Sequence, residues 1–269
     1  MAFYIGSQRV APTILTQDQS GYVGIPLELS NGTLQRQTQS FSWSSPANAT
    51  NIGNNALYYA FYNNTNLASV DLSGIATING NNALYNAFSS CTSLTSFNAE
   101  DLTTISGSQA IYYAFEDCSN LSSVDLSSLT TISGNSALQN AFRNCTSLTS
   151  VDLSGLTTIS SDYAMMNAFY GCSGLTSVNL SNLNSITGEQ ALQYAFRNCT
   201  SLSELRFPKL KSSSFGSVTS QFDYMLAGVT KCKVHFPSNL QSTIGSWTSV
   251  TSGFGGTNTT VLFDLPAAT

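Results

Sequence analysis

Apolar residues recur along the chain in a pattern that repeats every 27 residues. Its clearest mark is an Ala-Phe dipeptide, and the aligned copies approximate G-x-x-A-L-x-x-A-F-x-x-C-T-x-L-T-S-V-D-L-S-G-L-T-T-I-S. The phenylalanines of the six regular copies are Phe61, Phe88, Phe115, Phe142, Phe169 and Phe196. A degenerate half-copy precedes them at about 40–55, and a frayed copy follows at about 215–237. Such a period predicts a solenoid in which each repeat packs on its neighbours.

Two parts of each repeat have a recognisable periodicity. In the fourth copy, Val151 and Leu153 are apolar and Asp152 between them is polar, which is the alternation of a half-buried strand. Upstream, apolar residues at 137, 138, 141 and 142 have the spacing of one helical face. This helical piece is too short to be stable alone in water. We therefore expect each repeat to bury its apolar face against the next one.

The order A-F-x-x-C-x-x-L-x-x-V-x-L resembles the BspA-like leucine-rich repeat family over about residues 56–208, with weaker similarity to 237. The resemblance implies an α/β repeat fold. This is a right-handed leucine-rich-repeat solenoid with a parallel β-ladder on one face and short helical segments on the other. We expect an N-terminal cap or attachment segment at 1–39, the solenoid at 40–237 and a C-terminal cap at 238–269. Both caps are expected to be mostly β, because open solenoid ends must be covered.

Composition narrows the classes of function. Only 9% of the residues are charged, whereas serine (43) and threonine (29) are abundant. A net charge of −5 argues against nucleic-acid binding, which depends on basic patches. No apolar run approaches the roughly 18 residues of a membrane span, so membrane insertion is not expected. The opening residues also lack the pattern of a signal peptide, so we expect a trimmed form or a protein that leaves the cell without one.

The sequence does not predict an enzyme or a cofactor site. The chain has a single histidine, His235, and no nucleotide-binding loop, nucleophile elbow or zinc-protease motif. An enzyme built on a solenoid would need a local carboxylate or histidine cluster that breaks the repeat, and the copies in 56–208 carry none. We therefore expect a protein without catalytic residues, cofactors or bound metal.

Five cysteines occupy one column of the repeat, three residues after the phenylalanine. A linear stack does not converge on one point as metal ligands must, and parallel Cβ directions disfavour disulfides between coils. We expect buried, reduced thiols that pack as small apolar groups, which points to synthesis in a reducing compartment. This structural ladder consists of Cys91, Cys118, Cys145, Cys172 and Cys199.

A polar column follows the buried position of each predicted strand. Stacked carboxylates there could hold Ca²⁺, with Asp125 and Asp152 as the best pair. The structural alternative, which we favour, is that these side chains accept hydrogen bonds from the N–H groups of the turn beyond them. The same face is also the alternative ligand-binding surface. Its column consists of Asp71, Asn98, Asp125, Asp152, Asn179 and Arg206.

The outward side of the predicted helical segments varies from copy to copy and is rich in tyrosine. Tyrosine provides a large contact area at a low entropic cost and is enriched in binding surfaces. Alternatively, the rings lie over neighbouring coils and shield them. The sequence leaves both interpretations open. The candidate binding residues on this face are Tyr58, Tyr59, Tyr85, Tyr112, Tyr113, Tyr194, Arg143 and Arg197.

These observations predict a non-catalytic binding or attachment module for a bacterial or host surface protein or glycan. The resemblance implies surface attachment, since BspA-like proteins are typically adhesins or surface antigens. We favour a phage tail or fibre-associated receptor-binding protein, located on the virion, whose N-terminal segment contacts other virion proteins. The missing signal peptide, the reduced thiols and a resemblance of residues 4–10 to hairpins of phage tail-associated proteins favour it. The alternatives are a cell-surface adhesin whose leader was removed and a structural subunit that stacks through its caps.

Overall fold

The computed structural model describes residues 28–30, 33–35, 40–42, 50–215, 220–247, 250 and 252–268. Most of the expected N-terminal segment, including residues 4–10, lies outside the described residues. In this segment, β1 (Glu28–Ser30) and β2 (Thr33–Gln35) form an antiparallel pair.

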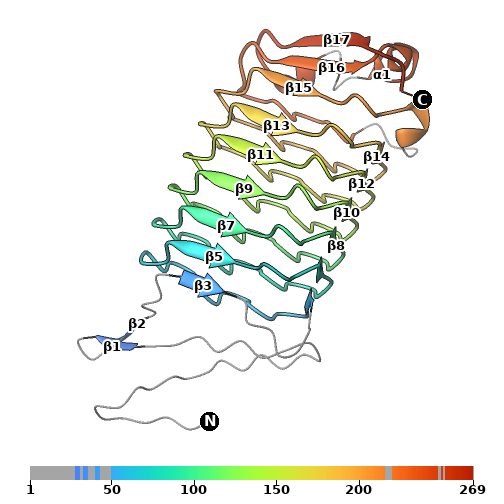
Figure 1. The fold of residues 1–269 in the computed structure, drawn as a ribbon. Helices are drawn as coiled ribbons and strands as arrows, with labels where there is room; N and C mark the ends of the chain where they lie inside the picture. Colours follow the sequence, from blue (N-terminus) through green and yellow to red (C-terminus); the bar gives the residue numbers. More distant parts are fainter. Residues whose placement is uncertain are drawn as a thin grey trace.

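The solenoid predicted from the 27-residue repeat is confirmed, and two parallel ladders of short strands run along it (Figure 1). The first ladder contains β3 (Ser40–Ser42), β5 (Ser69–Asp71), β7 (Ser96–Asn98), β9 (Ser123–Asp125), β11 (Ser150–Asp152) and β13 (Ser177–Asn179). The second contains β4 (Asn51–Ile52), β6 (Thr77–Ile78), β8 (Thr104–Ile105), β10 (Thr131–Ile132), β12 (Thr158–Ile159) and β14 (Ser185–Ile186). In the regular copies, paired residues are one repeat apart, so each position of the repeat forms a column along the stack.

Each of the short strands from β4 to β14 buries at most one side chain. In β11, Val151 is buried while Ser150 and Asp152 are exposed. In β12, Ile159 is buried and Thr158 is half-buried. The alternation predicted from the sequence is therefore the inside–outside alternation of a strand with one solvated face. This arrangement directs a row of polar side chains outward from β5 to β13.

The core is a set of stacked columns in which identical residues contact each other. The six repeat phenylalanines are fully buried, and their rings stack with centroids 5.1–5.7 Å apart. Interplanar angles between them do not exceed 18°. Aromatic pairs in this offset geometry add to the stabilisation from burial alone. The aromatic column therefore adds to the strand ladders as a contact between each coil and the next.

The predicted short helical segments are wrong, because this part of each repeat is a series of turns. In the fourth copy, Ser136, Asn140 and Asn144 have φ of 53°, 57° and 58°, which no α-helix contains. The N–H of Leu138 donates to Ala164 O in the next coil at 2.8 Å. The N–H of Gln139 instead donates to Ser136 O within the same turn at 3.1 Å.

This alternation explains why turns replace the helix. Every second N–H is needed for a hydrogen bond to the neighbouring coil, whereas an α-helix would use all of them along its own axis. Two inward residues followed by two outward residues give the same apolar spacing as one helical face. The burial prediction therefore holds, and Ala137, Leu138, Ala141 and Phe142 are all buried. We call this part of the repeat the turn segment, and its outward side the turn face.

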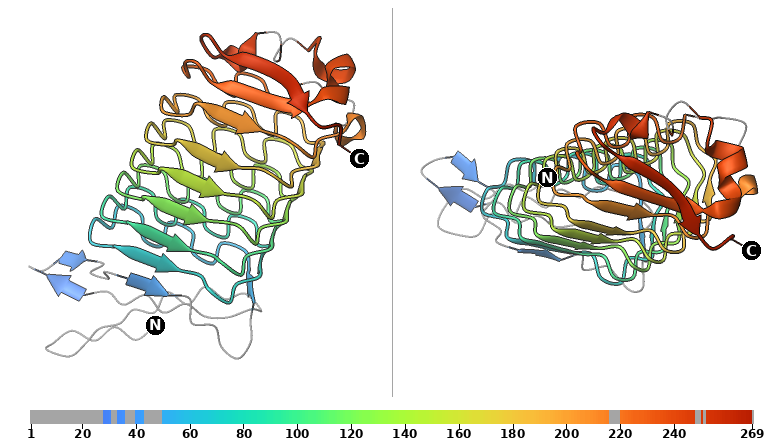
Figure 2. Two further views of the ribbon diagram at one scale, coloured as in Figure 1. Left: turned by 45° about the horizontal axis from the view of Figure 1, so that its top comes forward. Right: turned by 90° about the horizontal axis from the view of Figure 1, so that it is seen from above.

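The C-terminal end has longer strands. A third parallel sheet contains β15 (Glu204–Arg206), β16 (Lys233–Pro237) and β17 (Thr260–Leu265), and β17 lies across the end of the stack (Figure 2). Short helices accompany it: η1 (Ser212–Ser214), η2 (Ser238–Leu240), α1 (Gln241–Ile244) and η3 (Gly253–Gly255). Strand pairing joins β13 to β11 but not to β15, so the first ladder is interrupted there.

Candidate functional site

Three tyrosines of the turn face form a continuous stack. The rings of Tyr58 and Tyr85 lie 5.1 Å apart at 22°, and those of Tyr85 and Tyr112 lie 4.9 Å apart at 20°. Tyr58 is 49% exposed, whereas Tyr85 and Tyr112 are half-buried. Each ring covers its neighbour and also borders solvent, so the shielding contacts are present, and binding of a partner stays a prediction. The stack offers ring edges and hydroxyl groups to a partner, because its ring faces contact one another.

More tyrosines widen the N-terminal part of this stack. The ring centroid of Tyr59 lies 4.8 Å from that of Tyr58 and 5.5 Å from that of Tyr62. Tyr58 and Tyr62 are about half exposed. Further along, the ring of Tyr113 meets that of Tyr112 edge-on at 4.5 Å. Burial and the adjacent Tyr113 raise the pKa of Tyr112 to about 12. The Tyr112 phenol therefore stays protonated and acts as a hydrogen-bond donor at neutral pH.

The second half of the turn face combines guanidinium groups with aromatic rings. Arg143 Nη1 is 2.8 Å from Glu116 Oε1, and Arg143 Cζ lies 5.1 Å from the centroid of Tyr170. Arg197 Cζ lies 5.4 Å from the same Tyr170 centroid and 5.3 Å from that of Tyr194. These are cation–π distances. Among the described residues, no carboxylate forms an ion pair with Arg197.

Two tyrosines of this half were not among the candidates from the sequence. Tyr170 is held between the two guanidinium groups, in the column that follows the repeat phenylalanine. Tyr224 stacks on Tyr194 with centroids 5.3 Å apart and is 54% exposed. The frayed copy is offset by three residues, and this hides Tyr224 from a search at 27-residue spacing. A signal was available at Tyr170, because Arg143 and Arg197 stand one repeat before and after it.

Backbone geometry explains part of the variation on the turn face. In one column of the turn face, the residue of every coil has a positive φ, with values of 51–57°. Asparagine occupies three of the seven positions, and its short polar side chain tolerates the left-handed region. Variation in this column is therefore limited by the backbone as well as by any partner. It contains Tyr59, Asn86, Tyr113, Asn140, Asn167, Tyr194 and Tyr224.

On the strand face, the polar column accepts hydrogen bonds from the following turns. Asp125 Oδ1 accepts the N–H of Ser127 at 2.9 Å, and Asp152 Oδ1 accepts that of Ser154 at 2.9 Å. Equivalent bonds are made to Asp71, Asn98 and Asn179. Within the described part of the chain, no group of three acidic, cysteine or histidine side chains is arranged to hold a metal ion. These hydrogen bonds agree with the turn-stabilising interpretation.

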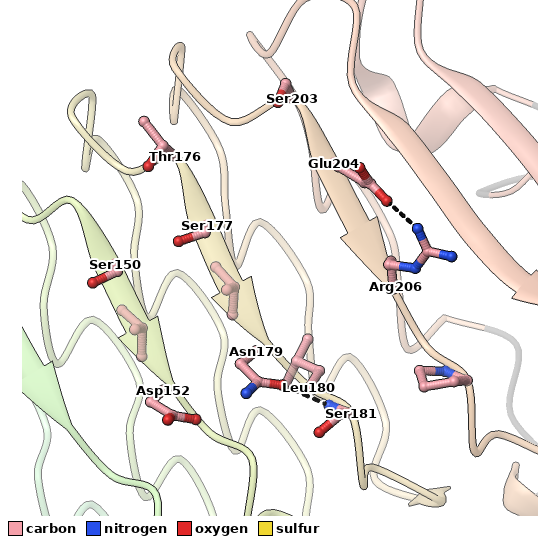
Figure 3. A pocket seen from close by; sticks show the side chains of 13 residues that line it. Ser150, Asp152, Thr176, Ser177, Asn179, Leu180, Ser181, Ser203, Glu204 and Arg206 are labelled. Carbon is pink, nitrogen blue, oxygen red and sulfur yellow. Dashed lines mark hydrogen bonds and ion pairs between the residues drawn. The ribbon is translucent and has the colours of Figure 1, made fainter.

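The strand face is hollowed where the first ladder is interrupted. Residues of β11, β13 and β15 line a groove of about 700 Å³ (Figure 3). Val178 on its floor is half-buried, although Val124 and Val151 in the same column are only 3% and 2% exposed. Arg206 and Glu204 form an ion pair at one side, with Nη1 and Oε1 2.6 Å apart. Strands β11, β13 and β15, which line the groove, lie far along the stack from segment 58–62, which comes between β4 and β5 (Figure 1).

The cysteine column faces the core. In each of five coils the S–H donates to the carbonyl oxygen of the phenylalanine 30 residues earlier, at 3.0–3.2 Å. All six cysteines are free and buried. Burial raises the pKa of Cys172 and of Cys232 to about 12. Such thiols are poor nucleophiles at neutral pH.

His235 lies on the central strand of the C-terminal sheet. Its Nδ1 is 2.8 Å from Asp264 Oδ1, and its Nε2 is 3.6 Å from Glu204 Oε1. The imidazole is buried, while the Asp264 carboxylate is exposed. The hydrogen bond therefore links β16 to β17.

Within the described residues, no helix is long and apolar enough to span a membrane.

Comparisons with known proteins give one family match. The model described as "BspA type Leucine rich repeat region" matches in 6 copies over residues 58–190 and 112–248. No curated protein matches the chain.

Several solved structures of bacterial proteins are similar to the chain. One is a leucine-rich repeat protein of T. pallidum, with 22% identity and a TM-score of 0.41 over 66% of this chain and 87% of that one. Another is a leucine-rich cell surface protein from Faecalibacterium prausnitzii, with 14% identity and a TM-score of 0.27 over 91% and 95%. An internalin from Listeria monocytogenes has 12% identity and a TM-score of 0.19 over 75% and 62%.

Proposed function

The chain belongs to the BspA-type leucine-rich repeat family, and from this premise we propose that it is a non-catalytic module that attaches to a protein or glycan on a cell surface. The family suggests a surface-binding or adhesive role. The observation that carries the proposal is the turn face, where stacked tyrosines lead into an Arg–Tyr–Arg arrangement around Tyr170. Tyrosine and arginine are the side chains that dominate binding energies at protein interfaces.

The tyrosines are suited to binding because their positions are already fixed. Each ring of the stack is held by neighbours about 5 Å away, so little rotamer entropy is lost when a partner binds. Arg197 contributes donors without a competing carboxylate among the described residues. The aromatic part and the cationic part together offer a partner three kinds of group, namely phenol hydroxyls, ring edges and a guanidinium.

The family supports a bacterial cell surface as the setting, which is the adhesin alternative. The virion setting, a phage tail or fibre-associated receptor-binding protein, remains the competing proposal. It rests on the resemblance of residues 4–10 to hairpins of phage tail-associated proteins and on the free thiols. Residues 4–10 lie outside the described part of the chain. Both settings require the same turn face to recognise a surface partner, so one experiment addresses both.

The test measures binding of the fluorescently labelled protein to a panel of bacteria and to fibronectin, fibrinogen and mucin. Saturable binding to a few strains supports the virion setting, and binding to the matrix proteins alone supports the adhesin. The key variant is Tyr112→Gln with Tyr113→Asn, which installs the pair that Gln139 and Asn140 form in the next coil. We expect it to reduce binding at least about tenfold.

The matched control is Met166→Gln, which changes the same column two coils further along and removes no aromatic ring. We expect binding of this variant to be unchanged. If the tyrosine pair can be replaced without effect on any bound partner, the turn face is not the binding surface. If nothing binds and the protein forms polymers in light scattering, the structural-subunit alternative replaces this proposal.

A further inference from the structure

A groove lies on the strand face where the first ladder is interrupted. β13 is the last strand of the sheet that begins at β3, and β15 belongs to the C-terminal sheet. Val178 is partly uncovered at this step, whereas its counterparts in β9 and β11 are buried. The groove lining therefore combines apolar side chains, among them the partly exposed Val178, with polar ones. Its volume of about 700 Å³ is in the range of small-ligand sites.

In the groove, a hydrogen-bond acceptor of Asp152 and a hydrogen-bond donor of Asn179 lie on adjacent strands. Asp152 Oδ1 and Asn179 Oδ1 each accept one turn N–H. Among the described residues no partner occupies Asp152 Oδ2 or Asn179 Nδ2. The two residues are paired one coil apart, and neighbouring strands are about 4.8 Å apart. One ligand can therefore contact both groups at once.

The other pairs of adjacent coils in this column differ from the pair formed by Asp152 and Asn179. Between the first two regular copies, Asn98 Nδ2 already donates to Asp71 Oδ1 at 3.2 Å. Asp125 and Asp152, on adjacent coils, are both carboxylates, so this pair supplies only hydrogen-bond acceptors. The step from Asp152 to Asn179 thus combines both hydrogen-bond types, and it is the step inside the groove.

The charge and the other lining groups restrict the ligand. Asp152 and Glu204 are acidic and Arg206 is basic, so the groove carries one net negative charge and disfavours anions. Hydroxyl groups of Ser150, Ser177 and Ser203 line the rest of the wall (Figure 3). A neutral ligand with adjacent hydroxyls fits this set, because each hydroxyl both donates and accepts.

We propose that the groove between β11, β13 and β15 binds a neutral glycan segment. Asp152 and Asn179 bracket two adjacent hydroxyls, and Val178 packs against the apolar face of the sugar ring. The inference rests on the proposed binding function and assigns a ligand class to a surface separate from the turn face. A protein partner on this groove is the competing outcome.

The experiment screens the full chain on an array of neutral, amino and acidic glycans and measures the affinity of the best neutral ligand. Asn179→Asp removes the donor, keeps the turn acceptor and adds a charge, and we expect it to weaken binding at least about tenfold. Asp152→Asn removes the charged acceptor and should weaken binding to a similar degree. Both changes preserve side-chain shape, so the fold is retained.

Two controls separate this proposal from the one for the turn face. Asp125→Asn alters the same column one coil earlier, outside the groove lining, and should leave glycan affinity unchanged. The Tyr112→Gln, Tyr113→Asn variant should also leave it unchanged. Selective binding of acidic glycans, binding of protein alone, or equal affinities for Asn179→Asp and Asp125→Asn would each overturn the groove proposal. Loss of cell binding in the tyrosine variant would still support the turn face.

Discussion

His235 Nδ1 and Asp264 Oδ1 are 2.8 Å apart, and this hydrogen bond ties the last strand of the molecule to the strand beneath it. The carboxylate has no proton to give, so the imidazole N–H donates. The bond lowers the pKa of Asp264 from its usual 3.8, with a further contribution from the charge of Arg206. A folded-state pKa below the unfolded one means that the ionised carboxylate stabilises the fold.

The pH dependence of stability should reveal this bond. The stabilisation is present above the unfolded pKa of 3.8 and is lost as the pH falls through the lower folded pKa. We expect the melting temperature to fall more steeply between pH 5 and pH 2.5 in the wild type than in Asp264→Asn. Glu100→Gln is the control, because its carboxylate contacts no basic group among the described residues. If the melting temperatures of the two variants fall equally between pH 5 and pH 2.5, the His235 bond does not stabilise β17.

A substitution in the turn segment should change the free energy of unfolding in opposite directions depending on whether the segment is a series of turns or an α-helix. Asn167 has φ of 54°. At this φ, Asn167→Ala should lower the free energy of unfolding by about 1 kcal/mol, whereas Asn167→Gly should be neutral or slightly stabilising. In an α-helix alanine would be the better residue and glycine the worse one. Urea unfolding measures both variants.

The neighbouring position is the control for this prediction. Met166 lacks the positive φ, so Met166→Gly should destabilise the protein where Asn167→Gly does not. A stabilising effect of Asn167→Ala would show that the turn description of this segment is wrong.

The repeat predicts columns well, because any residue one repeat away must lie directly above or below. The phenylalanine stack, the buried cysteines and the polar strand column all follow from that rule. The conformation of the turn segment does not follow from it. Ala137, Leu138, Ala141 and Phe142 are buried in either conformation, and only the hydrogen-bond demand of the adjacent coil distinguishes the two.

The candidate surfaces depend on departures from the repeat, which its regular spacing does not predict. Val151 and Val178 are the same residue type in the same column, yet only Val178 lies beside an interrupted ladder. Tyr224 joins the turn face because the last coil is offset by three residues. Both features depend on how the final coils pack, and sequence spacing alone contains no signal for that packing.

The thiols provide a measure of the integrity of the stack. All six cysteines are free and buried, and burial raises the pKa of Cys172 and Cys232 to about 12. We expect no reaction with a thiol reagent at pH 8 in the native protein, and reaction of six thiols after unfolding in urea. Reagents attack the thiolate, which a buried thiol with a raised pKa does not form. A subset that reacts quickly under native conditions would show that some coils open independently.

Replacing Glu116 and replacing Arg143 should have unequal effects on the free energy of unfolding. Burial and the nearby Asp117 raise the pKa of Glu116, although Arg143 acts in the other direction. A folded-state pKa above the unfolded one means that protonated Glu116 favours the fold, and that this contribution is lost as the pH rises above the usual 4.5. Glu116→Gln should therefore change the free energy of unfolding at pH 7 by less than about 1 kcal/mol, in either direction. Arg143→Met should cost more, since it leaves the half-buried carboxylate unpaired and removes the cation from Tyr170.

The double variant tests the coupling between these two side chains. In the Glu116→Gln background, Arg143→Met should cost less than in the wild type, because no carboxylate is then left without a partner. Chemical denaturation of the four proteins at pH 7 measures this difference. Equal costs in both backgrounds would mean that the 2.8 Å contact is energetically neutral. In that case Arg143 is held by its contact with Tyr170 alone, and its guanidinium is as available to a partner as that of Arg197.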